Sequence, residues 1–262
     1  MGVLNVTPDS LWMGAGALAA DAALLRMRAM ADAGAAICDV GAESTRPGSD
    51  PVAPAVQLER LAGVLTVLRE GRAPLPVSID TSSAEVADAM LRAGAVMVND
   101  VSAGRRDPRM LSTVAEHGAA ICLVHMRGTP RDMQRSPRYE DVVGEVCAHL
   151  QERAAAAIAA GVRPGDIIVD PGIGFAKTLE HNLALLGATG RLASLGYPLL
   201  VGVSRKSMFG LLLGRDVEER MPASLAAGLA CVARGAAVLR VHDVRETRDA
   251  LRVWTAIEGT GR

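Results

Sequence analysis

The sequence predicts a single α/β domain spanning residues 1–262, folded as a (β/α)8 barrel of the TIM type with its active site at the C-terminal ends of the strands. Two patterns lead to this prediction. Short apolar runs rich in β-branched residues alternate with segments whose apolar residues have helical spacing, and polar residues follow the runs rather than precede them. Eight such units in 262 residues fit a closed barrel better than an open doubly wound sheet, although the period alone leaves both forms open.

The eight expected strands are the short apolar runs of the chain. Each is apolar nearly throughout, which is typical of parallel strands covered on both faces. In chain order they are GVLNV (2–6), AICDV (36–40), PVSID (76–80), AVMVND (95–100), AAICLVH (119–125), DIIVD (166–170), LLVGVS (199–204) and AVLRVH (237–242).

The segments between the strands carry helix start and stop signals. One segment has four leucines at helical spacing behind Pro54, namely Leu58, Leu61, Leu65 and Leu68. Another is expected to begin with Asp107 as N-cap and Pro108 at its first position, and to end before Gly118. Left-handed C-cap residues after other helices are expected at Gly34, Gly94, Gly161 and Gly235. No linker or low-complexity tract marks a second domain.

Composition favours a small-molecule partner. Hydrophobic residues make up 50% of the chain and aromatic residues 2%, so the core is expected to be aliphatic. The net charge of −1 provides no electrostatic footprint for nucleic acid or an anionic membrane. The four cysteines lack the spacing of a disulfide framework or a zinc site. No secretory signal opens the chain and no apolar run approaches ~18 residues, which predicts a cytoplasmic protein with no membrane partner.

Polar residues collect directly after the expected strands. The active site of such a barrel is built from the loops at these strand ends. The residues are Asn5, Thr7, Asp9, Glu43, Thr45, Arg46, Asp80, Thr81, Asn99, Asp100, His125, Arg127, Asp170, Ser204, Arg205, Lys206, Ser207, Arg240, His242 and Asp243. Any one of them can be explained as a helix cap or turn former. A capping role does not explain the same bias at all eight ends.

The charges at these ends predict a ligand with two faces. Four side chains are expected to converge on an anion: Arg46, Lys206, Arg240 and His242. Three others offer acceptors for the N–H edge of a flat amino-heterocycle: Asp80, Asn99 and Asp170. A phosphorylated heterocycle satisfies both sets. Of the adjacent pair Arg205 and Lys206, Lys206 is expected to face the ligand and the other residue to point elsewhere.

Other motifs are weaker. The segment GIGFAKT (172–178) has glycines and a Lys-Thr pair but lacks the spacing of a phosphate-binding loop. His117, His149 and His181 lie in helical segments away from the strand ends and are interpreted as ordinary surface or supporting residues.

Taken in order, the strand-end motifs resemble the dihydropteroate synthase family along almost the whole chain. The motifs are MGVLNVTPDS (1–10), DVGAESTRPG (39–48), SIDT (78–81), VNDVSAG (98–104), LVHMRGTPRDMQ (123–134), DPGIGFAKT (170–178), GVSRKS (202–207) and RVHDV (240–244). The resemblance implies a TIM barrel, usually a homodimer, that condenses 6-hydroxymethyl-7,8-dihydropterin pyrophosphate with 4-aminobenzoate. The products are 7,8-dihydropteroate and pyrophosphate, in folate biosynthesis.

The resemblance also implies roles for individual residues. It implies a pterin site made of Asp80, Asn99, Met126, Asp170, Phe175 and Lys206. It assigns pyrophosphate to Asn5, Arg240 and His242, with Asn5 also holding Mg²⁺. It assigns 4-aminobenzoate to Thr45, Arg46, Pro47 and Ser207. The residues that it implies to be catalytic are Lys206, Arg46 and Asp80.

The first loop departs from the family pattern. The family commonly has D-S-F-x-D-G-G where this chain has DSLWMGAG, with Leu11, Met13 and Ala15 at the changed positions. Because Leu11 offers less flat surface than an aromatic residue, altered handling of sulfonamides is expected. The chain begins one residue before the first strand motif, and a segment that usually precedes this motif is expected to be missing.

Two alternatives remain open at this stage. One is a pterin-binding barrel that transfers a methyl group from methyltetrahydrofolate to a corrinoid, which has no need of STRPG, SRKS and RVH. The other is a pterin-binding paralogue without catalytic activity, which the altered first loop favours. Pyrophosphate release separates this paralogue from the synthase.

Overall fold

The computed structural model describes residues 1–6, 17–45, 48–129 and 131–259. Six strands form a parallel sheet in chain order and two more form a parallel pair. The six are β1 (Gly2–Asn5), β2 (Cys38–Gly41), β3 (Val77–Asp80), β4 (Met97–Asp100), β5 (Ala120–Val124) and β6 (Ile167–Asp170). The pair is β7 (Leu200–Val201) and β8 (Val238–Leu239).

Isolated parallel bridges join the two sheets at both seams. Val169 of β6 bridges to Leu199, directly before β7. Gly2 of β1 bridges to Val241, shortly after β8. The Val3 N–H donates to the Val241 carbonyl at 3.1 Å across the second seam. The eight strands therefore close into a TIM barrel, as the sequence predicted.

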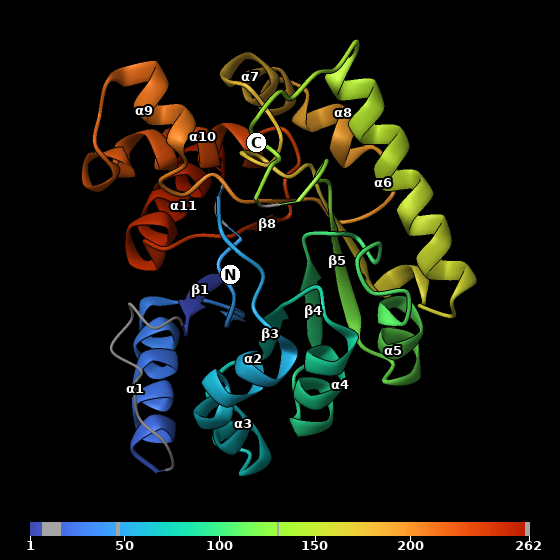
Figure 1. The fold of residues 1–262 in the computed structure, drawn as a ribbon. Helices are drawn as coiled ribbons and strands as arrows, with labels where there is room; N and C mark the ends of the chain where they lie inside the picture. The colour runs from blue at the N-terminus through green and yellow to red at the C-terminus, as the bar shows by residue number, and fades with distance from the viewer. Residues whose placement is uncertain (7–16, 46–47, 130, 260–262) are drawn as a thin grey trace.

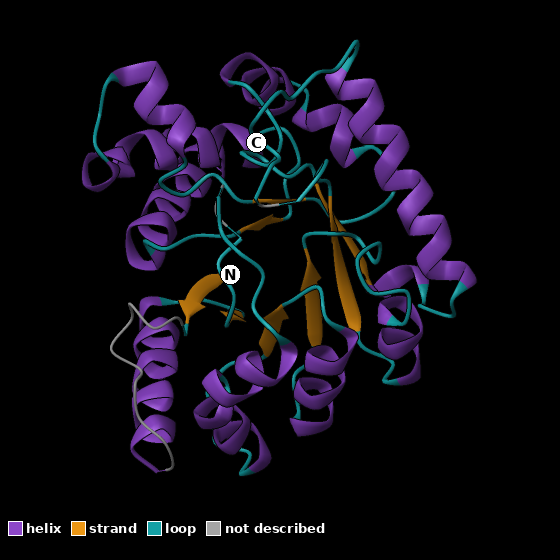
Figure 2. Ribbon diagram, viewed as in Figure 1, coloured by secondary structure: helices purple, strands orange, loops and turns teal. Residues whose placement is uncertain are grey.

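Helices surround the strands on the outside (Figure 1, Figure 2). They are α1 (Ala17–Ala33), α2 (Pro54–Arg60), α3 (Ala62–Arg69), α4 (Ala84–Ala93), α5 (Met110–Glu116), α6 (Val142–Ala159), α7 (Leu179–Gly187), α8 (Thr189–Ala193), α9 (Ser207–Leu213), α10 (Met221–Val232) and α11 (Val244–Gly259). Short 3-10 turns span Pro164–Asp166 and Val217–Arg220. No helix in these described ranges is long and apolar enough to cross a membrane.

Helix ends match the sequence signals at most but not all positions. The four glycines expected to end helices all have left-handed φ values, such as +117° at Gly94. The leucine-rich segment behind Pro54 is divided into α2 and α3 at the buried Leu61. The helix predicted to start at Pro108 starts at Met110 instead, so that boundary was wrong. The Asp107 carboxylate accepts a hydrogen bond from the Ala84 N–H, at the start of α4, and so caps a neighbouring helix.

Alternate strand residues face two different environments, because successive side chains of a strand point to opposite faces. One set, including Val40, Ile79 and Val98, packs into the large aliphatic cluster that also contains helix residues. The other set forms a small apolar cluster of Met97, Cys122, Val124 and Leu200. Buried polar residues occupy the remaining positions of this second set: Asp39, Ser78, Asp80, Asn99 and Asp170. The barrel interior is thus partly polar, and this polar part is the site.

Candidate active site

The centre of the site is a buried cluster of two carboxylates, an amide and a guanidinium group. Arg240 donates from Nε to Asp39 Oδ2 at 2.7 Å and from Nη2 to Asp80 Oδ2 at 2.8 Å. Asn99 Nδ2 donates to the same Asp39 oxygen at 3.1 Å. The side chain of Asp39 is fully buried and that of Arg240 is 22% exposed. Arg240 therefore bridges β2 and β3 from the segment after β8 and leaves part of its surface facing outward.

Three oxygens of this cluster have no hydrogen-bond donor among the described residues. They are Oδ1 of Asp39, Oδ1 of Asp80 and Oδ1 of Asn99, and all three are buried. A buried acceptor without a partner costs roughly 1–3 kcal/mol, so native proteins rarely leave several together. The cluster is suited to a ligand that brings N–H donors to it.

A second group of residues lies at the ends of β6 and β7. Asp170 ends β6, is 6% exposed and accepts a hydrogen bond at Oδ1 from the Gly172 N–H at 2.6 Å. Lys206 lies just before α9, and its Nζ is 4.6 Å from the centroid of the Phe175 ring. Met126 is 4% exposed and packs in a small cluster with Phe175. The predicted pterin residues are thus brought to one end of the barrel.

Burial shifts the protonation equilibria of these groups. Loss of solvation raises the pKa of Asp80 to about 7, with Arg240 opposing the shift and Asp39 adding to it. Burial also raises the pKa of Asp170, and it lowers the pKa of Lys206 to about 8. For Arg240, burial alone would lower the pKa, but Asp39 and Asp80 outweigh it and the pKa is raised. The guanidinium therefore stays charged, whereas Asp80 and Lys206 titrate close to neutral pH.

Of the cationic pair singled out in the sequence, Arg205 is the one that points away. It has a φ of +54° and forms a two-point ion pair with Asp243, with distances of 2.9 and 2.6 Å. The Arg205 N–H also donates to Ser224 Oγ at 2.8 Å. The two adjacent cations therefore have different surroundings, with Arg205 paired to Asp243 and Lys206 lying against Phe175.

His242 is exposed and is held by the buried Ser204. The His242 N–H donates to Ser204 Oγ at 3.1 Å, and the ring Nδ1 is 3.0 Å from the same oxygen. Ser204 follows β7 and His242 follows β8, so this contact joins the ends of two neighbouring strands. Ser207 is exposed at the first position of α9.

Asn5 and the loop after β2 complete the predicted set. Asn5 is exposed at the end of β1, opposite Gly41 of β2. Thr45 is half-buried. Arg46 and Pro47 lie outside the described residues, as do Leu11, Met13 and Ala15 of the first loop.

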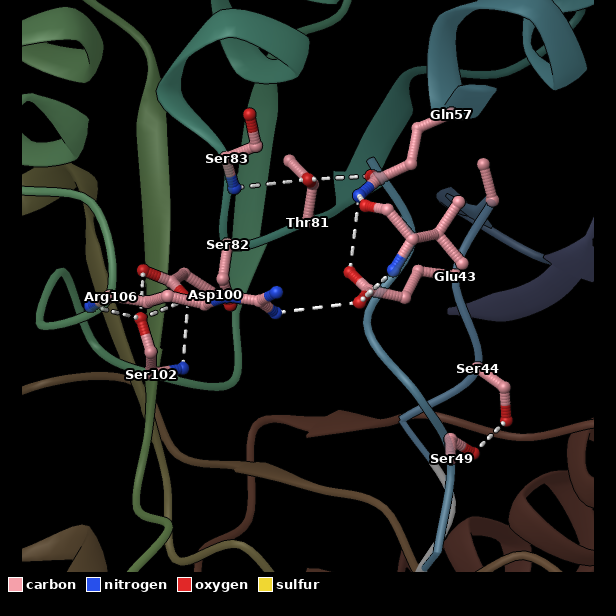
Figure 3. Close-up of polar contacts among 12 residues, drawn as sticks. Glu43, Ser44, Ser49, Gln57, Thr81, Ser82, Ser83, Asp100, Ser102 and Arg106 are labelled. Atoms are coloured by element: carbon pink, nitrogen blue, oxygen red, sulfur yellow. Dashed lines mark hydrogen bonds and ion pairs between the residues drawn. The ribbon is translucent and has the colours of Figure 1, made fainter. Parts of the chain in front are cut away.

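The base of the loop after β2 is fixed by a polar network around Glu43 and Gln57, which Figure 3 shows. Glu43 accepts hydrogen bonds from the Val52 N–H at 3.0 Å and from Gln57 Nε2 at 3.2 Å. Gln57 also donates to the Val52 carbonyl and accepts from Thr81 Oγ1. These contacts clamp the two ends of the segment that carries Thr45. Glu43 also pairs with Arg106 and Thr81 Oγ1 also accepts from the Ser83 N–H, so both side chains stabilise the loops around them.

Asp100 has a similar structural role, also drawn in Figure 3. Its carboxylate accepts hydrogen bonds from Ser82 Oγ, from the N–H and Oγ of Ser102, and from the Gly104 N–H. A carboxylate with four local donors has its acceptor capacity filled. Its position at the end of β4 therefore stabilises two loops.

Two residues of the site were missed by the sequence analysis. Asp39 lies within β2 and not at its end, and Lys177 lies in the segment set aside for lacking a phosphate-loop spacing. Lys177 is 3% exposed, and its Nζ is 2.9 Å from His125 Nδ1. A charged residue inside an apolar strand run was the available signal for Asp39, because Asp is almost never fully buried without a partner.

Comparison with known proteins agrees with the geometry. The family model for pterin binding enzymes matches residues 1–242. Dihydropteroate synthase of Mycobacterium leprae (strain TN) is 46% identical over 260 residues, which cover 97% of this chain and 91% of that protein. A crystal structure of the Yersinia pestis dihydropteroate synthase with a sulfonamide drug complex superimposes with a TM-score of 0.91 at 39% identity, covering 99% and 94% of the two chains. The Thermus thermophilus enzyme in complex with 4-aminobenzoate gives 0.86 at 46% identity, covering 98% and 93%.

Proposed function

Because the chain belongs to the dihydropteroate synthase family of pterin binding enzymes, we infer that it condenses 6-hydroxymethyl-7,8-dihydropterin pyrophosphate with 4-aminobenzoate. It is thus a transferase of folate biosynthesis that releases 7,8-dihydropteroate and pyrophosphate. The observation that supports this best is the group of three unpartnered buried oxygens on Asp39, Asp80 and Asn99. A pterin ring presents several N–H donors along one edge, and such an edge matches these acceptors.

In this proposal the pterin lies between Met126 and Phe175. Its N–H edge faces the acceptors of Asp80, Asn99 and Asp170, while Lys206 supplies a cationic donor from the opposite side. Lys206 Nζ lies 4.6 Å from the centroid of the Phe175 ring, which supports a position of this ammonium beside the ring that we propose to cover the pterin. The carboxylates of Asp80 and Asp170 can stabilise the positive charge that spreads into the ring as the C–O bond to pyrophosphate breaks.

The pyrophosphate is bound by Asn5, Arg240 and His242. The partly exposed guanidinium of Arg240 keeps donors available while Asp39 and Asp80 hold it in place. The described residues contain no cluster of three or more His, Cys, Asp or Glu side chains that would hold a metal alone. Asn5 is exposed at the end of β1, and an amide oxygen is a ligand type that Mg²⁺ accepts, together with phosphate oxygens and water. Mg²⁺ bound there would neutralise charge on the leaving pyrophosphate.

4-Aminobenzoate is bound by Thr45, Arg46, Pro47 and Ser207. The Arg46 guanidinium pairs with the carboxylate of 4-aminobenzoate, and Ser207 adds hydrogen-bond donors at the start of α9. Its amine attacks the pterin methylene carbon directly, within ~3–3.5 Å, so no covalent intermediate with the protein is required. The residues that we propose to act on the reacting groups are Lys206, Arg46 and Asp80.

We also propose that the protein is a cytoplasmic homodimer and a target of sulfonamides. Four leucines that are 42–72% exposed lie on α7 and α9, which contact each other: Leu183, Leu211, Leu212 and Leu213. Exposed leucines on neighbouring helices favour association with a second copy. Light scattering during gel filtration tests the dimer, and titration with a sulfonamide against 4-aminobenzoate tests competition.

The function is tested by following 7,8-dihydropteroate with mass spectrometry. We expect product only when both substrates and Mg²⁺ are present, and none after chelation with EDTA. Asn99→Ala is expected to raise the KM for the pterin substrate, and Ser207→Ala the KM for 4-aminobenzoate. A native chain that binds dihydropterin but forms no product would support the non-catalytic paralogue.

A further inference from the structure

Lysine is rare in this chain, and both copies lie at the same end of the barrel. The 28 basic residues include two lysines, Lys177 and Lys206. Lys206 belongs to the proposed pterin site. Lys177 has no role in the proposed chemistry, although it is 3% exposed and lies seven residues after the end of β6. All other basic residues of the chain are arginines, so a lysine at a buried position calls for an explanation from its contacts.

The contacts of Lys177 explain why a lysine is present. Its Nζ lies 2.9 Å from His125 Nδ1, 3.0 Å from the Gly172 carbonyl and 2.9 Å from the Phe175 carbonyl. Among the described residues no carboxylate forms an ion pair with it. Three short contacts match the three N–H donors of an ammonium group. A planar guanidinium presents five donors in a rigid fork and cannot reproduce this arrangement.

The two carbonyls nearest Lys177, those of Gly172 and Phe175, belong to the loop between β6 and α7, and the His125 carbonyl lies farther away at 3.4 Å. Three residues of this loop have left-handed backbone: Gly172 (φ +67°), Gly174 (φ +84°) and Ala176 (φ +52°). The alanine adopts this conformation at an energetic cost, since left-handed backbone is unfavourable for residues with a Cβ atom. Two carbonyls of this loop, those of Gly172 and Phe175, meet at the Lys177 ammonium group, which holds the loop in this shape. Tyr139 OH donates to the Ala176 carbonyl at 3.0 Å and supports the same loop from outside.

Two residues of the pterin site depend on the shape of this loop. Gly172 accepts from Lys177 at its carbonyl and donates its N–H to Asp170 Oδ1 at 2.6 Å. Phe175 accepts from Lys177 at its carbonyl, and its ring lies over Lys206 Nζ. Lys177 thus connects through one residue to the Asp170 carboxylate and directly to the backbone of Phe175.

We propose that Lys177 is a positioning residue for the pterin substrate: its ammonium group holds the β6–α7 loop so that Asp170 and Phe175 face the ring. This role rests on the function proposed above. Lys177 does not touch the substrate itself, because its donors are taken up by His125 and the two carbonyls. Burial lowers the pKa of Lys177 to about 7 and that of His125 to about 2, so below neutral pH the proton of this pair stays on the lysine.

The test compares Lys177→Met with Thr178→Ala. Methionine keeps the length and apolar stem of the side chain but removes all three donors. Thr178 caps α7 by accepting from the His181 N–H, so its change to alanine loosens the adjacent helix without touching the loop carbonyls. Steady-state KM values for both substrates, dihydropterin affinity by calorimetry and Tm are measured for the native chain and both variants.

We expect Lys177→Met to raise the KM and the Kd for the pterin by about tenfold or more, the scale seen when a residue that orients binding groups is removed, and to change the KM for 4-aminobenzoate less than about twofold. Thr178→Ala should lower Tm without this split between substrates. Equal losses for both substrates, or equal losses in both variants, would show a general structural role and overturn the proposal. A native chain that binds dihydropterin without forming product would refute the proposed function, and the affinity ratio would still decide the role of Lys177.

A second measurement applies if Lys177→Met does not fold. Native protein labelled with ¹⁵N at lysine Nζ has two side-chain signals, and the one that remains in Lys206→Ala belongs to Lys177. At pH 6 we expect its ammonium hydrogens to exchange slowly with water and the signal to shift when dihydropterin binds. Exchange as fast as that of free lysine, or no response to the pterin, would contradict a positioning role.

Discussion

Asp39→Asn tests whether the buried ion pair organises the site. Asp39 is fully buried, holds Arg240 through Nε and holds Asn99 through its amide. Removing one member of a buried ion pair typically costs 3–5 kcal/mol, since the other charge stays buried. Here Arg240 keeps Asp80 at 2.8 Å and is 22% exposed. We therefore expect a loss near the lower limit, about 3 kcal/mol in the free energy of unfolding.

Asp243→Asn is the matched control for this change. Asp243 also faces an arginine with two hydrogen bonds, but Arg205 is 33% exposed and the pair lies nearer the surface. An ion pair in such a position contributes roughly 1 kcal/mol or less. Both variants are unfolded with urea at pH 7.5, and the KM for the pterin substrate is measured in parallel. We expect a rise in this KM for Asp39→Asn alone.

The result that would refute this reasoning is a loss of stability in Asp39→Asn no larger than that in Asp243→Asn. An unchanged pterin KM would separately show that Arg240 and Asn99 keep their positions without Asp39. Because the charge of Asp39 also raises the pKa of Asp80, the variant should bring that pKa closer to its ordinary value.

Two further predictions concern pH and glycine. The probe for pH dependence is 6-hydroxymethyl-7,8-dihydropterin, which carries no titrating pyrophosphate. Its affinity, measured by calorimetry, should be highest between pH about 7 and about 8, because Asp80 gains a proton below this range and Lys206 loses one above it. An affinity that stays constant from pH 5.5 to 9 would contradict both pKa shifts. The pKa of Asp80 is raised from 3.8 to about 7, so between these two pH values the native state retains a proton that the unfolded state has lost. The contribution of Asp80 to the free energy of unfolding should therefore fall as the pH rises from 3.8 to about 7. Gly172→Ala should lower the stability of the protein far more than Gly196→Ala, although both glycines have positive φ. A Cβ at Gly172 would lie 1.9 Å from the His125 carbonyl oxygen, whereas a Cβ at Gly196 meets nothing within 4 Å. Similar urea midpoints for the two variants would show that the loop can move away.

The barrel was predictable because its strands are short, apolar and regularly spaced. The ends of the strands were also informative: Asp80, Asn99, Asp170 and Arg240 were all singled out, and the structure brings them to one end of the barrel. Sequence could not separate ligand residues from structural ones there, because caps, turns and binding sites use the same polar side chains. Glu43 and Asp100 turned out to bind loop backbone.

Asp39 and Lys177 were missed for different physical reasons. Asp39 lies in the middle of a strand, and its importance comes from Arg240, which is 201 residues away in sequence. Lys177 is held by two backbone carbonyls, which any residue can provide, and by His125, which is 52 residues away in sequence, so no local side-chain pattern marks its site. The segment GIGFAKT (172–178) was set aside because it lacks the spacing of a phosphate-binding loop, while the scarcity of lysine in the chain was the signal that could have identified Lys177.

The most direct test of the whole account is pyrophosphate release from 6-hydroxymethyl-7,8-dihydropterin pyrophosphate in the presence of Mg²⁺, with and without 4-aminobenzoate, for the native chain and Lys206→Ala. We predict release that requires 4-aminobenzoate in the native chain and falls by at least about a hundredfold in the variant, as expected when a donor that stabilises the reacting substrate is removed. Release that is independent of 4-aminobenzoate, or equal in the two proteins, would contradict it.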